Sequence, residues 1–273
     1  MADRDFVIED GVLKQYVGVD REVRIPEGVS EICENVFFDE NDPFGTESER
    51  YPTAITIPKS VLRVSPRAFD NCAKLSTIRV AEGNPVYHGA GNCLIETASK
   101  TLVVGCVNSV IPADGSVVRI GKDAFWGRSG LTVAIPECVT EIGEAAFIGC
   151  KNLLKITIPA GVAAIRGSTF GECNNLICIE LPEGLQIIGE YAFIGCFNLS
   201  SLRIPRSVTE IGPCAFADCT GLREIVFAGM KAEWDAIKKG DYWDVATGDY
   251  VIRCSDGEIP KKVPPDPRFC EHN

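Results

Sequence analysis

The side chains best suited to chemistry in this chain are its 13 cysteines and its 2 histidines. A catalytic thiol needs a base beside it, and a zinc site needs cysteines or histidines at short, regular spacings. His88 lies in the turn-like stretch NPVYHGAGN, His272 lies near the C-terminus, and the motifs H-x-x-x-H, C-x-x-C and the glycine-rich phosphate loop do not occur. The sequence therefore predicts no catalytic residue, no metal site and no bound cofactor.

Five cysteines recur at one position of a repeat, three residues after a phenylalanine: Cys72, Cys150, Cys173, Cys196 and Cys219. On strands stacked about 5 Å apart, these cysteines would lie within disulfide distance of one another. Cysteine is also a small, polarisable apolar residue that fills tight interior columns. Packing explains one cysteine per turn, so we expect reduced, buried thiols.

Cys178 falls outside this column, at an outward-facing position of a predicted strand. We interpret it as a neutral surface residue and keep a reactive thiol as the alternative hypothesis. A reactive cysteine needs an exposed, electropositive environment that stabilises its thiolate. Labelling of the folded protein with an impermeant maleimide would distinguish the two interpretations.

Acidic side chains outnumber basic ones, 38 to 27, which gives a net charge of −11 and a pI of about 4.8. Nucleic-acid binding requires clustered lysine and arginine, and the longest basic run is Lys261-Lys262, so we expect no nucleic-acid partner. Glutamates such as Glu141, Glu144 and Glu190 lie at turn positions and indicate a solvated face rather than paired catalytic acids. No run of about 18 apolar residues is present, so we expect no membrane-spanning segment.

These residues are positioned by a repeat of 23 residues, marked by prolines at Pro136, Pro159, Pro182 and Pro205. A fixed period of about 20 to 29 residues with leucine-like anchors is typical of a leucine-rich-repeat solenoid. Within each unit, alternation of apolar and polar residues predicts a short strand that ends at the proline, followed by a second short extended segment. A glycine then turns the chain, where close backbone approach or a positive φ is expected.

An Ala-Phe pair follows the glycine in several units, as in Ala146-Phe147, Ala192-Phe193 and Ala215-Phe216. We expect the phenylalanine rings to stack from turn to turn as a spine of the core. The predicted fold is mainly β with short helical turns: a leucine-rich-repeat solenoid with a 23-residue repeat, capped at both ends. At the usual strand spacing, roughly nine turns would be about 40 Å long.

Irregular segments interrupt the repeat or end it. Asp10-Gly11 between apolar runs predicts a capping hairpin. A polar stretch rich in turn formers predicts an inserted loop, and two apolar runs around TASK predict a hairpin that bulges from the stack. The expected organisation is an N-terminal capping hairpin (1–25), the solenoid (26–227) with a loop insertion (38–52) and a hairpin insertion (81–107), a C-terminal cap with tryptophans over the last turn (228–259), and a frayed tail (260–273).

The unit I-P-x-x-V-x-x-I-G-x-x-A-F-x-x-C resembles the BspA-type leucine-rich repeats of bacterial and some protozoan surface proteins. The opening FVIEDGVL, the interruption GNPVYHGAGNCLIETASKTLVVGC and the ending GMKAEWDAIKKGDYW strengthen this resemblance, which covers about residues 6–259. It implies an elongated, curved solenoid that serves in adhesion or protein–protein contact, often on a cell surface. It carries over no catalytic residue.

Strand residues that point away from the core should line the concave sheet face, which is mixed in charge and has no aromatic cluster. We expect a weak, extended partner-binding site there, made by Arg79, Lys155, Thr157, Cys178, Glu180, Ser201, Arg203 and Glu224. Binding residues also gather on irregular insertions. Phe44 and Tyr51 are therefore candidate anchors in the 38–52 loop.

These patterns predict a non-enzymatic, monomeric module that recognises a protein or glycan ligand, as in bacterial adhesion or host–microbe contact. One alternative is a structural spacer or scaffold of a larger surface assembly, and another is a thiol-dependent enzyme. The first residues, MADRDFVIEDG, lack the pattern of a secretory signal, which predicts a cytoplasmic location for the chain as written. The resemblance implies instead a cell-surface or secreted location.

Overall fold

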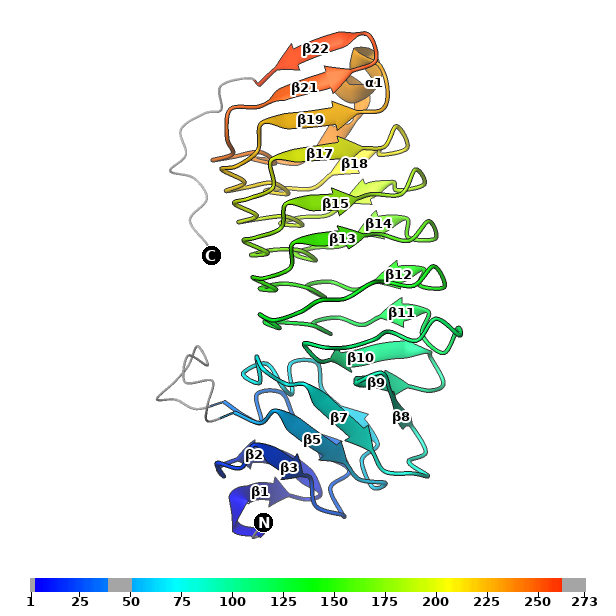
Figure 1. The fold of residues 1–273 in the computed structure, drawn as a ribbon, viewed down its shortest axis with the longest axis vertical. Helices are drawn as coiled ribbons and strands as arrows, with labels where there is room; N and C mark the ends of the chain where they lie inside the picture. Colours follow the sequence, from blue (N-terminus) through cyan, green and yellow to red (C-terminus); the bar gives the residue numbers. More distant parts are fainter. Residues whose placement is uncertain (1–2, 39–50, 262–273) are drawn as a thin grey trace.

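The computed structural model describes residues 3–38 and 51–261. Phe44, most of the predicted 38–52 loop, and the end of the chain from residue 262 with His272 lie outside the described residues. The chain winds as a β-solenoid of about 10 turns, with the first hairpin at one end and the last strands at the other (Figure 1). The predicted fold class is confirmed, and the solenoid has about one turn more than expected.

One side of each turn, here called the long-strand face, carries the strand that precedes the proline. Alternation sets its burial: in β13, Ile156 is buried between exposed Lys155 and Thr157. Neighbouring strands pair in parallel without a register shift, as in β13 with β15 and β17 with β19. The strands are β3 (Glu22–Arg24), β5 (Ala54–Ile57), β7 (Thr77–Val80), β13 (Lys155–Thr157), β15 (Cys178–Glu180), β17 (Ser201–Ile204), β19 (Glu224–Phe227) and β21 (Val251–Cys254).

A second side, the short-strand face, consists of two-residue strands whose second residue points inward. Pro159 closes the turn between the two faces, because its carbonyl accepts a hydrogen bond from the N–H of Val162 (3.1 Å). The strands are β4 (Glu31–Ile32), β6 (Arg63–Val64), β11 (Arg119–Ile120), β12 (Glu141–Ile142), β14 (Ala164–Ile165), β16 (Ile187–Ile188), β18 (Glu210–Ile211) and β20 (Lys238–Lys239). The second extended segment expected in each repeat is thus present in these turns.

A glycine follows five of these short strands, β11, β12, β16, β18 and β20, and close approach of two backbones requires it. A Cβ on Gly212 would lie 2.5 Å from the backbone nitrogen of Glu190, and a Cβ on Gly189 would lie 2.7 Å from the carbonyl carbon of Arg166. Neither glycine has a positive φ. Of the two reasons given for this glycine by the sequence, close approach is the one that applies.

The third side, the turn face, carries the Ala-Phe pairs. Backbone hydrogen bonds also join successive turns here: the N–H of Phe147 donates to Thr169 and the N–H of Gly149 donates to Gly171 (2.9 and 2.8 Å). From residue 123 onward two residues per turn, four positions apart, adopt a positive φ, as in Ala145 (53°) and Gly149 (69°). This conformation costs energy for a residue with a Cβ, and the N–H groups of both residues donate to the next turn of the stack.

Antiparallel pairs occur at the two ends of the solenoid. At the N-terminal end, after a short 3-10 helix (Asp3–Asp5), β1 (Phe6–Glu9) and β2 (Val12–Tyr16) form a hairpin whose turn residues Asp10 and Gly11 both have positive φ. At the C-terminal end, β21 pairs with β22 (Gly257–Pro260) beside the short helix α1 (Lys231–Ala236). Figure 1 shows both pairs closing the stack.

The predicted 81–107 hairpin does not bulge from the stack. It contributes β8 (Tyr87–Ala90), β9 (Cys93–Glu96) and β10 (Thr101–Gly105), and β10 pairs in parallel with β11 of the next turn. The buried side chains of the solenoid form two large apolar clusters, here called the N-terminal cluster (from Phe6 to Cys106) and the C-terminal cluster (from Cys93 to Ile252). Side chains of β9 alternate between them: Leu94 packs in the N-terminal cluster, and Cys93 and Ile95 pack in the C-terminal cluster. The insertion therefore lies between the two apolar clusters. Because both of its faces are buried, its strands are continuous apolar runs rather than alternating ones.

Candidate functional site

Four neighbouring strands of the long-strand face, β13, β15, β17 and β19, bring together seven of the eight residues predicted to bind a partner. Lys155 lies opposite Cys178 and Thr157 opposite Glu180 in the β13–β15 ladder. Ser201 lies opposite Glu224 in the β17–β19 ladder, with Arg203 on the same outward side. Apart from Cys178 and Glu224, which are half-buried, these residues are exposed. The four strands thus present one polar surface, here called the β13–β19 face.

Weak polar contacts connect the side chains of this face. The hydroxyl of Thr157 donates to Glu180 (3.1 Å), and the guanidinium of Arg203 lies 3.5 Å from Glu183. Glu224 accepts a hydrogen bond from Ser201 (3.4 Å) and pairs with Arg253 of β21. Exposed ion pairs contribute about 0–1 kcal/mol each, so these groups can exchange partners at little cost.

The remaining predicted residues lie elsewhere. Arg79 is on β7, in the three-stranded sheet β3-β5-β7, and the β8–β10 insertion separates it from the β13–β19 face. Tyr51 is only 6 % exposed and packs in the N-terminal cluster, so its ring is not available as an exposed anchor. Phe44 lies outside the described residues.

The cysteine column has a role that the sequence interpretation missed. Four of its thiols, those of Cys150, Cys173, Cys196 and Cys219, each donate a hydrogen bond to the carbonyl of the phenylalanine in the preceding turn, at 3.1 to 3.2 Å. A small residue with a donor therefore satisfies a backbone acceptor at each of these turns. Burial raises the pKa of Cys173 to about 12, so these thiols stay protonated at neutral pH. No disulfide bond joins the cysteines of the described residues to one another.

A second missed feature is a set of buried polar groups where the two clusters meet on the turn face. Arg128 is 2 % exposed, and its guanidinium donates to the carbonyls of Gly105 (3.0 Å) and Phe69 (3.3 Å). Asp123 is 7 % exposed, and neither of its carboxylate oxygens has a hydrogen-bond partner among the described residues. Burial raises the pKa of Asp123 to about 6, with a smaller upward contribution from the charge of Asp70 and an opposing one from Lys122.

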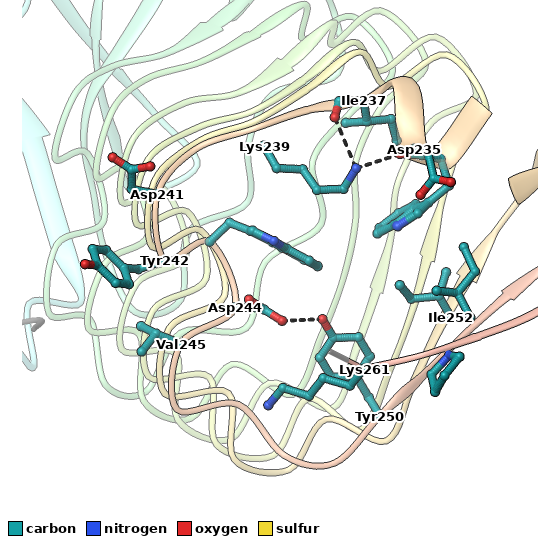
Figure 2. A pocket seen from close by; sticks show the side chains of 14 residues that line it. Asp235, Ile237, Lys239, Asp241, Tyr242, Asp244, Val245, Tyr250, Ile252 and Lys261 are labelled. Atoms are coloured by element: carbon teal, nitrogen blue, oxygen red, sulfur yellow. Dashed lines mark hydrogen bonds between the residues drawn. The ribbon is translucent and has the colours of Figure 1, made fainter. Parts of the chain in front are cut away.

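The third missed feature is a pocket of about 790 Å³ at the C-terminal end of the stack (Figure 2). Figure 2 shows Lys239 on one side of it and Asp244, Tyr250 and Lys261 on the other. Its walls come from the end of α1, β20, the following turn 241–245, and the last two strands. The sequence predicts only a cover of tryptophans there, so the charged lining is a new observation.

Metal and nucleophile chemistry find little support in the part of the chain that the structure describes. No cluster of three or more histidine, cysteine, aspartate or glutamate side chains there could hold a metal ion. His88 lies on β8, and its Nδ1 is 2.8 Å from the hydroxyl oxygen of Thr97. No helix in residues 3–38 or 51–261 is long and apolar enough to cross a membrane.

Comparison with known proteins gives a consistent result. The model of a family described as a BspA type leucine rich repeat region matches residues 47–90 and 106–233, in 6 copies. A leucine rich cell surface protein from Faecalibacterium prausnitzii A2-165 is 31% identical, with a TM-score of 0.64, and the match covers 80% of this chain but only 62% of that protein. No curated protein sequence matches the chain.

Two further solved structures are similar in fold alone, because their identities are below 25%. A leucine-rich repeat protein from Eubacterium ventriosum ATCC 27560 has a TM-score of 0.59 and 18% identity, over 87% of this chain and 69% of that one. The pneumococcal vaccine antigen PcpA has a TM-score of 0.54 and 22% identity, over 65% and 45%.

Proposed function

Because this chain belongs to the BspA-type leucine-rich repeat family, we propose that it is a recognition module that binds a protein partner through the β13–β19 face. It acts by association and not by catalysis. The proposal joins the protein-binding or adhesion-like role suggested by the family to one surface of this chain.

The observation that carries the proposal is the arrangement of exposed polar side chains on two neighbouring ladders, β13–β15 and β17–β19, each paired in register. Lys155, Thr157, Glu180, Ser201 and Arg203 are fixed at strand spacing because the backbones beneath them are paired in register. Their inward neighbours, such as Ile156 and Leu202, are buried in the C-terminal cluster. A partner therefore meets an ordered surface, and little conformational entropy is lost when it binds.

The charges of the face suit a partner of mixed polarity. Basic Lys155 and Arg203 alternate with acidic Glu180 and Glu224 across four strands. Charges of this kind in a polar rim govern association rate and specificity more than affinity. No aromatic residue lies among these side chains, so we expect micromolar rather than nanomolar affinity. Several such surfaces that bind at the same time would raise the overall affinity.

The thiols support a binding role rather than thiol catalysis. Nucleophilic cysteines need a lowered pKa or an adjacent base, whereas burial raises the pKa of the column cysteines. Cys178 lies on the β13–β19 face with no histidine on its own or the neighbouring strands of that face. We therefore place it among the contact residues.

Display at a cell surface is the second part of the proposal. It rests on similarity to the leucine rich cell surface protein from Faecalibacterium prausnitzii A2-165, of which this chain spans 62%. A role in bacterial adhesion or host–microbe contact would follow from such display. The competing role is that of a spacer within a surface assembly, which needs the solenoid but no partner on its face.

The test is a crosslinking pull-down from the native source, followed by titration of the purified partner. The variant Lys155→Glu/Arg203→Glu reverses two charges of the β13–β19 face. The matched control, Lys122→Glu/Arg166→Glu, makes the same change in net charge at exposed residues that flank the short-strand face. We expect the first variant to weaken binding at least about tenfold, or about 1.4 kcal/mol, and the control to bind as wild type.

The outcomes separate the candidate roles. Equal binding by both variants would remove the β13–β19 face from the proposal. Failure to capture any partner that saturates would favour the spacer role.

A further inference from the structure

We propose that the pocket at the C-terminal end of the solenoid binds a neutral saccharide. The site is separate from the β13–β19 face, and the inference does not depend on the function proposed for that face. It is carried by two positions at which the last turn departs from the rule followed by the turns before it.

The first departure is Lys239. In the short-strand face the inward residue is Ile165 in β14, Ile188 in β16 and Ile211 in β18, each aligned with the next in a parallel ladder. The same ladder aligns Ile211 with Lys239 of β20. The last turn therefore has a lysine at the position where the turns before it have a fully buried isoleucine.

The second departure is Asp244. The N–H of Phe193 donates to Ala215 and, one turn later, the N–H of Phe216 donates to Trp243. Trp243 thus takes the place of the alanine in the Ala-Phe pair, and Asp244 takes the place of the phenylalanine. The ring of Trp243 packs edge-on against Phe216 and ends the column of stacked rings, while the phenylalanine position itself carries the carboxylate of Asp244, which lines the pocket.

Both charged groups are held by the protein. The ammonium of Lys239 donates to the carbonyls of Trp234 (2.6 Å) and Ile237 (3.1 Å) and lies 4.7 Å from the centre of the Trp234 ring. Asp244 accepts a 2.6 Å hydrogen bond from the hydroxyl of Tyr250. Figure 2 shows both sets of bonds at the wall of the pocket.

The need for a polar, soluble end of the solenoid does not by itself explain Lys239 and Asp244. Terminal repeats are polar on their outer surface, and exposed Lys238 meets that need beside Lys239. Lys239 and Asp244 are instead half-buried and oriented by hydrogen bonds. Residues that break a local rule and are then supported by their neighbours are typical of functional sites.

The lining selects the ligand by charge. Three carboxylates (Asp235, Asp241 and Asp244) and two ammonium groups (Lys239 and Lys261) line the pocket, so a ligand with a net charge would meet like charges. Hydroxyl groups donate to carboxylates and accept from ammonium groups, so an uncharged polyhydroxyl ligand satisfies both.

The aromatic residues favour a sugar ring within that class. Trp234, Trp243 and Tyr250 surround the pocket, with Trp243 packed edge-on against Phe216, whereas the ring of Tyr242 points outward from the turn (Figure 2). Aromatic side chains offer apolar surface beside a polar group, which matches a pyranose ring with its apolar faces and polar rim. The volume of about 790 Å³ falls within the range of small-molecule sites, about 300 to 1,000 Å³.

The test uses saturation-transfer NMR on the full chain with neutral oligosaccharides of glucose, N-acetylglucosamine, galactose and mannose, followed by calorimetric titration of those that bind. Lys239→Ile restores the residue of the preceding turns, so it should fold at least as stably as wild type. Asp244→Asn keeps the shape and the acceptor for Tyr250. We expect each variant to lower the affinity at least about tenfold.

The matched control is Lys238→Ile, the same substitution at the neighbouring outward residue, which should bind as wild type. Thermal melting of all three variants separates lost binding from lost folding. The proposal is overturned if none of the neutral oligosaccharides saturates the wild type at millimolar concentration, or if Lys239→Ile and Asp244→Asn bind as tightly as wild type. Tighter binding of an oligosaccharide of uronic acids would overturn the neutral class.

Discussion

The phenylalanine stack and the junction between the two apolar clusters fill the interior between neighbouring turns in different ways. From Phe125 to Phe216, five rings follow one another at centroid distances of 5.1 to 5.7 Å and interplanar angles of 5 to 10°. In the N-terminal cluster, by contrast, Phe37 and Phe69 meet at 36°. Between the clusters, the guanidinium of Arg128 reaches the carbonyl of Phe69 from the turn that carries Phe125.

The difference shows what an equal repeat length does. When each turn has nearly the same number of residues, every ring returns to the same position and orientation, and one rotamer serves all turns. Where the β8–β10 insertion breaks the period, the neighbouring turns on the turn face no longer supply matching apolar groups. Polar side chains such as Arg128 and Asp123 then fill the gap, and they must find partners or remain unsatisfied.

The largest effect should come from breaking the stack in its middle. Phe170 is fully buried between the rings of Phe147 and Phe193. Phe170→Ala should lower the free energy of unfolding by about 3–5 kcal/mol, because it removes apolar contacts and leaves a cavity. Chemical denaturation followed by circular dichroism measures the change.

Exposed Phe197 provides the control for that substitution, since Phe197→Ala should change stability by less than about 0.5 kcal/mol. A loss of under about 1 kcal/mol for Phe170→Ala would contradict the stacked core at this turn.

The junction should respond to pH in a way that the stack does not. Burial raises the pKa of Asp123 from 3.8 to about 6, so the folded protein binds this proton more tightly than the unfolded chain does. The stabilisation is fully present below pH 3.8 and is lost as pH rises through about 6. Asp123→Asn should therefore stabilise the protein by about 2 kcal/mol at pH 7.5 and by little at pH 4.

Asparagine also suits the positive φ of 57° at this position, so the backbone should be undisturbed. The measurement is the difference in unfolding free energy between wild type and Asp123→Asn at several pH values, with Asp249→Asn as an exposed control. A difference that does not change between pH 4 and 7.5 would show that this carboxylate is not a source of instability at the junction.

These contrasts also mark how far the sequence could lead. The prolines and the alternation around residues such as Ile156 predict the strands, and the Ala-Phe pairs predict the ring spine, because each is repeated at a fixed spacing. The structure forms a hairpin of β9 and β10 around the TASK turn, and the sequence did not indicate that β10 also pairs with β11. A turn signal specifies the hairpin and not the strand that lies next to it.

The candidate sites were harder to predict for the same reason. Arg79 was grouped with the β13–β19 face because the pattern gives outward positions but not the sheet to which a strand belongs. Lys239 and Asp244 were missed because the last turn is longer than the repeat, so their alignment with isoleucine and phenylalanine emerges only from the hydrogen bonds. Aligning YWDVAT with CAFADC would have indicated it.

The smallest effect should come from the hydrogen bonds of the cysteine column. Cys173 is fully buried and its thiol donates to the carbonyl of Phe147, whereas half-buried Cys178 lies on the β13–β19 face. Cys173→Ala removes a weak donor and leaves a small void, so it should cost about 1–2 kcal/mol in chemical denaturation. Cys178→Ala should cost less than about 0.5 kcal/mol. Equal costs for the two substitutions would contradict a stabilising role for the buried thiol of Cys173 and its hydrogen bond.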